Sequence, residues 1–275
     1  MANEVHLFPE LLEGELVARY ARFLADVRLK NGRVVRVHCV NSGRMEGLVR
    51  PGARVWLSRA ASKSRKLRYT WELIEEGNAT NSAERLLVGA NTALPNRLVG
   101  TLLAERRIAG FEDVTSIRPE QPYGRGHRID FLLERRHGNS RAAPHYVEVK
   151  NCHLVYPDGG AYFPDSTSER ATRHVHALTR LAKRGVLATV IFTVQRSDGR
   201  FVRPSQHHDP AFARALRQAT RSGVTVRALS FDVSLRGLTY LGELPVDVER
   251  YDTRTLLPWA LALKSTSGWK SRVPR

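Results

Sequence analysis

The change of hydrophobic period along the chain is the feature that most constrains its fold. Up to about residue 80, apolar and polar residues alternate over short stretches, which is typical of strands. From Asn91 onward, helical periods and strand-like runs follow one another. Short strands alone build barrels or sandwiches, whereas helices mixed with strands build α/β layers. The sequence therefore predicts a small β-barrel followed by an α/β domain.

The first part of the chain predicts an OB-like barrel. Two alternating runs flank the turn at Lys30–Arg33, where Asn31-Gly32 is a strong hairpin signal. Further short strands are expected at Met45–Val49, Arg54–Leu57 and Leu67–Ile74. Five short antiparallel strands in this length are typical of a small barrel, and the sequence alone leaves its topology open.

The second part predicts a layered α/β domain. Its expected elements are, in order, a helix at Leu94–Gly110, strands at Val114–Arg118, His127–Glu134 and His145–Val155, a helix at Ser166–Arg184, a strand at Val186–Gln195, a helix at Asp209–Arg221 and strands at 224–233 and 235–244. We therefore expect a nucleic-acid-binding OB-like barrel at residues 1–84 and the α/β domain at 85–250. Residues 251–275 are expected to form a basic, partly flexible C-terminal extension.

The charge of the chain favours a polyanionic partner. Lys and Arg number 44 against 27 Asp and Glu, so the formal net charge is +17. Nucleic acid and an anionic membrane are the simplest partners that such a charge attracts. The longest apolar run, Val186–Val194, is too short to span a bilayer, so we expect no membrane insertion. With two cysteines and no signal-peptide pattern, we expect a cytoplasmic protein that is able to associate with the nucleoid.

Basic residues concentrate in the predicted barrel. Between Arg28 and Arg68, Glu46 is the only acid in the sequence. Such a surface can follow a phosphate backbone while Trp56 and Tyr69 stack on bases; the alternative is a solvated basic face with Trp56 in the core. The candidate nucleic-acid-binding residues are Arg33, Arg36, Arg44, Lys63, Arg65, Lys66 and Arg68, together with Arg173 at the start of a predicted helix.

Two neighbouring strand candidates carry acids that can act together. In HRIDFLL, Asp130 lies among apolar residues, where an unpaired charge is costly. In HYVEVKN, Glu148 and Lys150 lie two residues apart and point to one face. If the strands form a hairpin, Asp130 and Glu148 lie side by side. A Mg²⁺ or Mn²⁺ ion between them, with the Val149 carbonyl as a further ligand, gives a phosphodiester-cleaving site. In such a site Lys150 orients the attacking water or stabilises developing charge.

Each of these features also has a simpler interpretation. Glu148 and Lys150 can form a salt bridge at a sheet edge, with Asp130 paired to an arginine. His207, His208 and Asp209 are adjacent and so cannot easily share one metal; Asp209 instead predicts a helix N-cap, followed by a Pro in the first turn.

Several motifs together resemble a known family. They are NSGRMEGLVRPG at 41–52, RKLRYTWEL at 65–73, ANTALPNRLV at 90–99, RIDFLL at 128–133, YVEVKN at 146–151 and FPDS at 163–166. On these motifs the chain resembles the sugar fermentation stimulation protein family. The resemblance implies an OB-like domain, a restriction-endonuclease-like domain of the PD-(D/E)xK nuclease fold, and DNA binding. It also implies that Asp130, Glu148 and Lys150 form the nuclease core, with Glu120 as a fourth acid.

The chain departs from the family pattern at a few positions. His127 stands where the family has Ser, Arg173 where it has Lys, and Gly100 where the first helix has an acid, unless Glu105 replaces it. These departures concern cleavage more than DNA binding. Two functions follow: a Mg²⁺-dependent nuclease that binds DNA, or a non-catalytic DNA-binding transcriptional regulator of sugar metabolism genes. The retained core residues favour the enzyme, and no feature requires a third function, a metabolite sensor.

Overall fold

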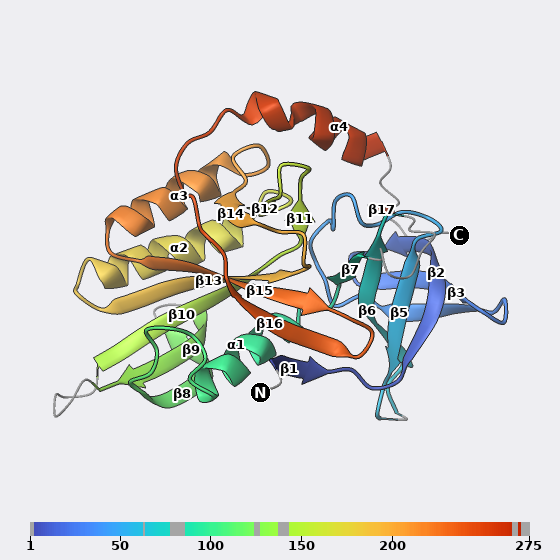
Figure 1. Ribbon diagram of the computed structural model, residues 1–275, viewed down its shortest axis with the longest axis horizontal. Helices are drawn as coiled ribbons and strands as arrows, with labels where there is room; N and C mark the ends of the chain where they lie inside the picture. Colours follow the sequence, from blue (N-terminus) through green and yellow to red (C-terminus); the bar gives the residue numbers. More distant parts are fainter. Residues whose placement is uncertain are drawn as a thin grey trace.

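The chain folds into two units that lie side by side, a β-barrel and a mixed α/β domain (Figure 1). The structure is a computed structural model that describes residues 3–62, 64–77, 86–123, 127–136, 143–265 and 269–270. Most of the barrel precedes the α/β domain in the chain, as the change of hydrophobic period predicts.

Five strands close into the barrel. They are β2 (Leu11–Tyr20), β3 (Leu24–Leu29), β4 (Val34–His38), β5 (Arg54–Arg59) and β6 (Tyr69–Glu76). The ring runs β2-β3-β4-β6-β5 and returns to β2, with β4 and β6 parallel and the other neighbours antiparallel. Alternate side chains such as Val35 and Val37 are buried inside, because successive strand residues face opposite sides. β7 (Leu86–Gly89) extends the sheet beside β6. The predicted OB-like barrel is confirmed.

The segment Met45–Val49, expected as a strand, forms a turn instead. Met45 and Gly47 have left-handed backbones, with φ of 52° and 81°. The amide of Leu48 donates to the carbonyl of Met45 at 3.0 Å. Both Met45 and Leu48 are fully buried in the barrel core. The apolar residues of this segment fill the barrel interior. The secondary structure of a short apolar run that is buried in this way cannot be predicted from its hydrophobic period alone.

The α/β domain is built on a mixed sheet of seven strands. In spatial order these are β1 (Glu4–Leu7), β16 (Gly237–Glu243), β15 (Thr225–Val233), β13 (Leu187–Gln195), β10 (Ala143–Cys152), β9 (His127–Arg135) and β8 (Val114–Tyr123). β10, β13 and β15 run parallel, and the other neighbours are antiparallel. β13 lies at the centre and is buried from Ala188 to Gln195, as is usual for a strand covered on both faces.

Helices cover both faces of this sheet (Figure 1). They are α1 (Leu94–Ala104), α2 (Glu169–Ala182) and α3 (Pro210–Arg221). α1 packs on one face with Phe131 and Val147, whereas α2 and α3 pack on the other with Phe192. α1 ends earlier than the sequence predicts, and Arg106, just beyond it, has a left-handed φ of 55°. No helix within the described ranges is long and apolar enough to cross a membrane.

The first strand belongs to the second unit. β1 pairs with β16 of the α/β sheet, and Val5 and Phe8 pack against the core of that domain. The barrel, expected to start at residue 1, therefore begins at β2. The alternation of a four-residue strand does not specify which sheet it joins, because any sheet with a free edge and an apolar face accepts it.

A small sheet of β11 (Leu154–Val155), β12 (Gly160–Phe163) and β14 (Phe201–Pro204) lies beside α3 (Figure 1).

The C-terminal segment contacts both units. The last elements within the described residues are η2 (Thr253–Leu256), α4 (Leu257–Ser265) and β17 (Trp269–Lys270). Ala260 of α4 packs with Tyr156 and Tyr162, while β17 pairs with β2 of the barrel. The other residues of the expected extension beyond Ser265 lie outside the described ranges.

Candidate active site between the two units

A cleft of about 920 Å³ lies between the barrel and the α/β domain. On the α/β side it is lined by Asp130, Glu148 and Lys150, together with the start of α2. On the barrel side it is lined by the turn after β2 and by the loop Asn41–Arg44. Ligand sites occur preferentially where two domains meet. The three residues that the sequence singles out as a nuclease core thus come together in this cleft.

The strands that carry these residues separate at the site. β9 and β10 pair as far as Phe131 and Val147. Beyond that point the amide of Val149 donates to Oδ2 of Asp130 at 2.7 Å. The Asp130 carboxylate therefore takes the place of a backbone acceptor where the strands diverge. Because the N–H and C=O of a strand residue point to the same side, the Val149 carbonyl also faces this gap.

Another acid and an amide flank Asp130. Glu120 lies between two β8 residues that pair on either side of Asp130, so it is directly opposite, with a left-handed φ of 52°. Nδ2 of Asn96, in the first turn of α1, donates to Oδ1 of Asp130 at 2.8 Å and lies 3.4 Å from Oε1 of Glu120. Glu120 is exposed and does not line the cleft. The predicted fourth acid is thus beside the site, joined to it through Asn96.

Glu148 is buried and held by two neighbours. Its exposed fraction is 2%. Oε1 accepts a hydrogen bond from Nζ of Lys150 and lies 2.5 Å from Nδ1 of His174 on α2. Oε2 is buried and has no hydrogen-bond partner among the described residues. A buried carboxylate oxygen without a partner is destabilising, so this atom is the one that most favours a bound ligand.

Asp130 and Glu148 differ in pKa. Burial, and then the charge of Glu148, raise the pKa of Asp130 above its ordinary value. Burial also acts to raise the pKa of Glu148, but the charge of Lys150 and the hydrogen bond with His174 outweigh burial and leave that pKa below its ordinary value. Glu148 is therefore the more readily ionised acid, and a cation between the two would relieve their repulsion.

The available donors fit a hard divalent cation. The carboxylates of Asp130 and Glu148 and the carbonyl of Val149 are oxygen ligands, which Mg²⁺ prefers. In the part of the chain that the structure describes, no three His, Cys, Asp or Glu side chains form a ligand cluster. The protein thus offers two carboxylates and a carbonyl rather than a closed cage, and Mg²⁺ usually keeps several waters in such a site.

A buried arginine shapes the barrel side of the cleft. Arg19, at the end of β2, is fully buried. Its guanidinium donates to the carbonyls of Arg22, Asn41, Gly43 and Arg44 at 2.6–3.0 Å. One buried cation thus holds both barrel segments that line the cleft. Nothing in the sequence marks this arginine, because its partners are backbone carbonyls from two separate segments.

Two buried carboxylates, each beside a histidine, make contacts that join the units. Oδ2 of Asp165 accepts the Met45 amide at 2.7 Å and lies 3.2 Å from Nε2 of His153. Nε2 of His208 lies 2.6 Å from Oε2 of Glu46. Burial opposes the ionised form of Asp165, but His153 and the Met45 amide outweigh it and lower its pKa to about 2. Because its partner Glu46 lies in the barrel, His208 is a residue of the interface between the two units.

The predicted nucleic-acid-binding residues are spread over the surface. Among those that the structure describes, Arg44 alone lines the cleft. Arg173 is exposed on α2 and pairs with Glu169 at 3.5 Å. Trp56 is buried in the core, so the expectation that it stacks on bases is wrong. The other predicted residues of the barrel are exposed and lie outside the cleft lining: Arg33, Arg36, Arg65, Lys66 and Arg68. Lys63 lies outside the described residues.

The departures from the family pattern have a structural explanation on α1. A Cβ at Gly100 would lie 3.4 Å from the ring of Phe131, so this position packs against β9. Glu105 follows the end of the helix and pairs with Arg107 at 3.0 Å, so it does not replace a site acid. The contact from α1 to the site is made by Asn96. The sequence missed Asn96 because its role appears only once α1 is packed.

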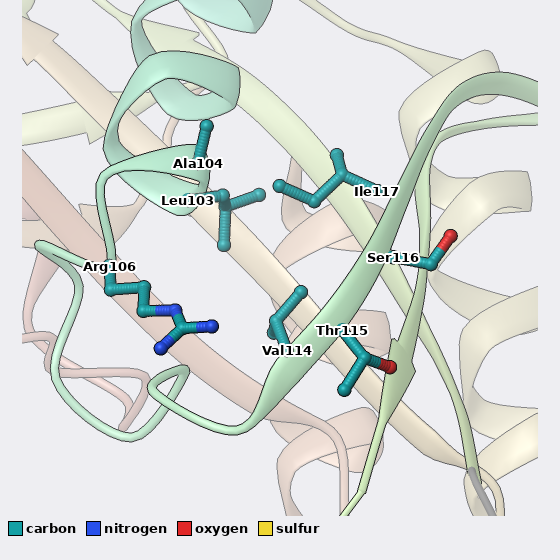
Figure 2. Close-up of a pocket in the computed structure, with 7 residues that line it drawn as sticks. All are labelled: Leu103, Ala104, Arg106, Val114, Thr115, Ser116 and Ile117. Carbon is teal, nitrogen blue, oxygen red and sulfur yellow. The ribbon is translucent and has the colours of Figure 1, made fainter.

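A second, smaller hollow of about 260 Å³ lies between the end of α1 and β8. Figure 2 shows the apolar side chains of Leu103, Val114 and Ile117 gathered there, with Arg106 to one side. The side chains that line it include no acid or histidine. It therefore lacks the groups that acid–base or metal chemistry needs.

Known proteins share this two-part structure. A family model described as SfsA N-terminal OB domain matches residues 17–81, and one described as sugar fermentation stimulation protein RE domain matches residues 93–237. The chain belongs to the sugar fermentation stimulation protein family. A homolog of this name from Maricaulis maris is 44% identical over 82% of this chain and 92% of its own length. One from Thioalkalivibrio sulfidiphilus is 42% identical over 88% of this chain and 98% of its own length.

A solved structure from the same family has the same fold. The structure of Pyrococcus furiosus SfsA in complex with Ca²⁺ superposes with a TM-score of 0.79 at 26% identity, covering 89% of this chain and 99% of that one. The family that the motifs predict is thereby confirmed. Its N-terminal OB domain belongs to a class of barrels that bind oligonucleotides and oligosaccharides.

Proposed function

We propose that this member of the sugar fermentation stimulation protein family binds DNA and hydrolyses phosphodiester bonds with Mg²⁺ or Mn²⁺. The observation that carries the proposal is the assembly of Asp130, Glu148 and Lys150 in one cleft, with a buried Glu148 oxygen that has no partner among the described residues. The OB domain and the net charge of +17 support a nucleic-acid partner. The relative solved in complex with Ca²⁺ supports a divalent cation.

The cleft residues have separable roles in this proposal. Asp130, Glu148 and the Val149 carbonyl would hold the cation, which supplies charge stabilisation and a bound water of lowered pKa. Lys150, bonded to Glu148 and with its side chain 13% exposed, is placed to contact a phosphate oxygen or the attacking water. Asn96 and His174 hold the two carboxylates in orientation before substrate binds.

The start of α2 supplies a further anion-binding feature. Ser168 caps the helix, and the segment from Thr167 to Ala171 lines the cleft. The first amides of a helix lack intrahelical acceptors and carry partial positive charge, so they favour a phosphate nearby. The exposed side chain of Arg170 lies at the same place, next to exposed Glu169, whose charge is paired with Arg173 at 3.5 Å.

Cleavage assays with the purified chain test the proposal. We expect plasmid and single-stranded DNA to be cut with Mg²⁺ or Mn²⁺ and not with EDTA. Asp130→Asn and Glu148→Gln should each abolish cutting, because each removes a charged ligand. Glu105→Gln, which changes a carboxylate of the same domain outside the cleft, should keep full activity. Cutting that persists in Asp130→Asn, or no cutting with any metal, would reject the proposal.

A non-catalytic DNA-binding regulator of sugar metabolism genes is the second candidate. The observation that favours it is the small ligand set, since Gly100 packs on Phe131 and α1 contributes no acid to the cleft. In that case DNA would bind, with affinity falling steeply as salt rises, and no metal would support cutting. Affinity that barely changes between low and moderate salt would contradict phosphate contacts in either candidate.

A further inference from the structure

The turn between β2 and β3 has a strained backbone at the cleft. Ala21 and Arg22 have left-handed φ values of 48° and 63°, although neither is a glycine. Residues with a side chain rarely adopt this conformation, and two in succession persist only where surrounding contacts hold them. Here the contact comes from buried Arg19, whose guanidinium donates to the carbonyl of Arg22 at 3.0 Å. A strained backbone that is stabilised at a cleft suggests that the residues of the turn that line the cleft, Arg22 and Phe23, have a function.

The strained turn presents an exposed aromatic ring. Phe23 is 46% exposed and lines the cleft, next to exposed Arg22. Its backbone is fixed, because its amide donates to the carbonyl of Ala21 at 2.7 Å and its carbonyl accepts from the amide of Cys39 at 2.9 Å. An exposed aromatic ring beside cations, in a groove, is the arrangement with which proteins stack on the bases of a single nucleic-acid strand.

Both walls of the cleft carry positively charged groups that can bind the phosphates of such a strand. Lys150, Arg170 and the start of α2 line the α/β side, and Arg44 lines the barrel side. Glu148 is only 2% exposed, so a scissile phosphate has to enter the cleft to reach it. A cleft of about 920 Å³ lies in the size range of sites for small ligands, which corresponds to a few nucleotides. In a duplex, moreover, the faces of the bases are covered by their neighbours and are closed to Phe23.

We propose that the cleft accepts an unpaired DNA strand, with a base stacked on Phe23 and phosphates bound between Arg22, Arg44 and Lys150. The position of the scissile phosphate rests on the proposed function, whereas stacking on Phe23 requires no cleavage. Stacking on an aromatic ring depends little on base identity, because every base has a π-face. The cleft therefore discriminates between paired and unpaired strands rather than between sequences.

Binding measured in EDTA tests this proposal without hydrolysis. The probes are a fluorescent oligothymidylate, an abasic strand of the same length with the same phosphates, and a duplex of that length. We expect the wild type to prefer the oligothymidylate over the duplex. Phe23→Ala should weaken oligothymidylate binding by about 5- to 100-fold, which is the loss of one stacked base. The abasic strand should bind both proteins equally, and Phe23→Trp should restore the affinity.

A matched control separates stacking from a general change in the barrel. Val34→Ala shortens another exposed apolar residue of the barrel, 50% exposed and outside the cleft lining, and should leave all affinities unchanged. An equal loss on the abasic strand, an unchanged affinity in Phe23→Ala, or tighter binding of the duplex by the wild type would each overturn the proposal. Base-dependent binding through Phe23 without cutting by any metal would support it and reject the proposed hydrolysis instead.

Discussion

At the residue scale, His174 determines how Glu148 is oriented. Its Nδ1 lies 2.5 Å from Oε1 of Glu148, which leaves Oε2 for a ligand. We expect His174→Ala to weaken binding of Mn²⁺ by about 10- to 100-fold, as is typical when a partner of a metal-ligating group is lost. Isothermal titration with Mn²⁺ measures this directly. His176→Ala, an exposed residue of the same helix, is the control, and equal affinity in the two variants would contradict the orienting role.

His145 predicts a pH dependence of stability. Its ring is buried, stacks on Phe111 at 5.1 Å and lies 2.8 Å from Oγ1 of Thr189. Burial, and then the charge of Arg135, lower its pKa from 6.5 to about 4. The unfolded chain therefore binds more protons between these values, so the free energy of unfolding falls as the pH drops through that window. We expect His145 to account for a loss of about 2 kcal/mol between pH 8 and pH 5.

Urea unfolding at the two pH values measures this contribution. His145→Gln removes the titrating group and should flatten the dependence of unfolding free energy on pH. His176→Gln replaces an exposed histidine and should leave the dependence unchanged. A slope in His145→Gln equal to that of the wild type would show that another group is responsible.

The residues of the candidate site were predictable from the sequence only in part. Asp130, Glu148 and Lys150 could be found because strand alternation fixes which charges share a face. Asn96 and Arg19 could not, because a helix packing on the sheet and carbonyls from two separate segments define their roles. Local periodicity shows which charged residues share a face of a strand, whereas the roles of Asn96 and Arg19 depend on tertiary packing.

At the element scale, the sequence predicts elements that are buried on one face better than those buried throughout. The barrel strands alternate, so β3 and β4 were located correctly. Met45–Val49 was assigned wrongly, because an apolar turn inside the barrel has no exposed side to interrupt its apolar run. The sheet membership of β1 was missed because the contact with β16 joins residues from opposite ends of the chain.

Asp209 connects two helices through one side chain. Oδ1 accepts the amide of Phe212 at 2.9 Å and so caps α3, as the sequence predicts, while Oδ2 accepts the amide of Ser168 at 2.8 Å at the start of α2. Because Asp209→Ala leaves both amides without their acceptor, we expect it to lower the free energy of unfolding by about 2–3 kcal/mol. Asp209→Asn, which can still cap, should lose less. Urea unfolding measures both.

The control for this prediction is a cap on the surface. Asp252 accepts the amide of Arg254 at 2.9 Å at the start of η2, where the surroundings are exposed. Asp252→Ala should therefore cost well under the loss in Asp209→Ala, since water replaces the missing acceptor. Equal destabilisation by the two variants would show that burial of the Asp209 contacts contributes nothing.

At the scale of the whole molecule, polar contacts cross the boundary between the two units, as does an apolar cluster in which Trp56 and Leu73 of the barrel pack with the core of the α/β domain. Met45 and Glu46 on the barrel contact Asp165 and His208 on the α/β domain, and Arg196 lies 3.6 Å from Glu76 across the same boundary. The Met45 and Glu46 contacts follow directly after the loop that lines the cleft. The geometry of the cleft therefore depends on how firmly these contacts join the units.

Asp165 is the contact whose loss should separate the units. We expect the wild type to unfold in one calorimetric transition at pH 7 and Asp165→Ala to unfold in two, with a loss of about 3 kcal/mol, because the Met45 amide and His153 lose their buried acceptor. The pKa of Asp165, about 2, lies below the ordinary value of 3.8, so its contribution is present above pH 4 and is lost as the pH falls toward 2. Calorimetry of the wild type at pH 3 should therefore show weakened coupling as well.

The matched control is an aspartate whose partner lies in its own unit. Asp247 pairs with Arg203 at 2.7 Å, both within the α/β domain, and its side chain is 40% exposed. Asp247→Ala should cost less than about 1 kcal/mol, as partly exposed pairs usually do, and should keep a single transition. If Asp165→Ala also keeps a single transition, the apolar contacts between the units are sufficient to couple them. The cleft would then owe its shape to packing rather than to the buried pairs.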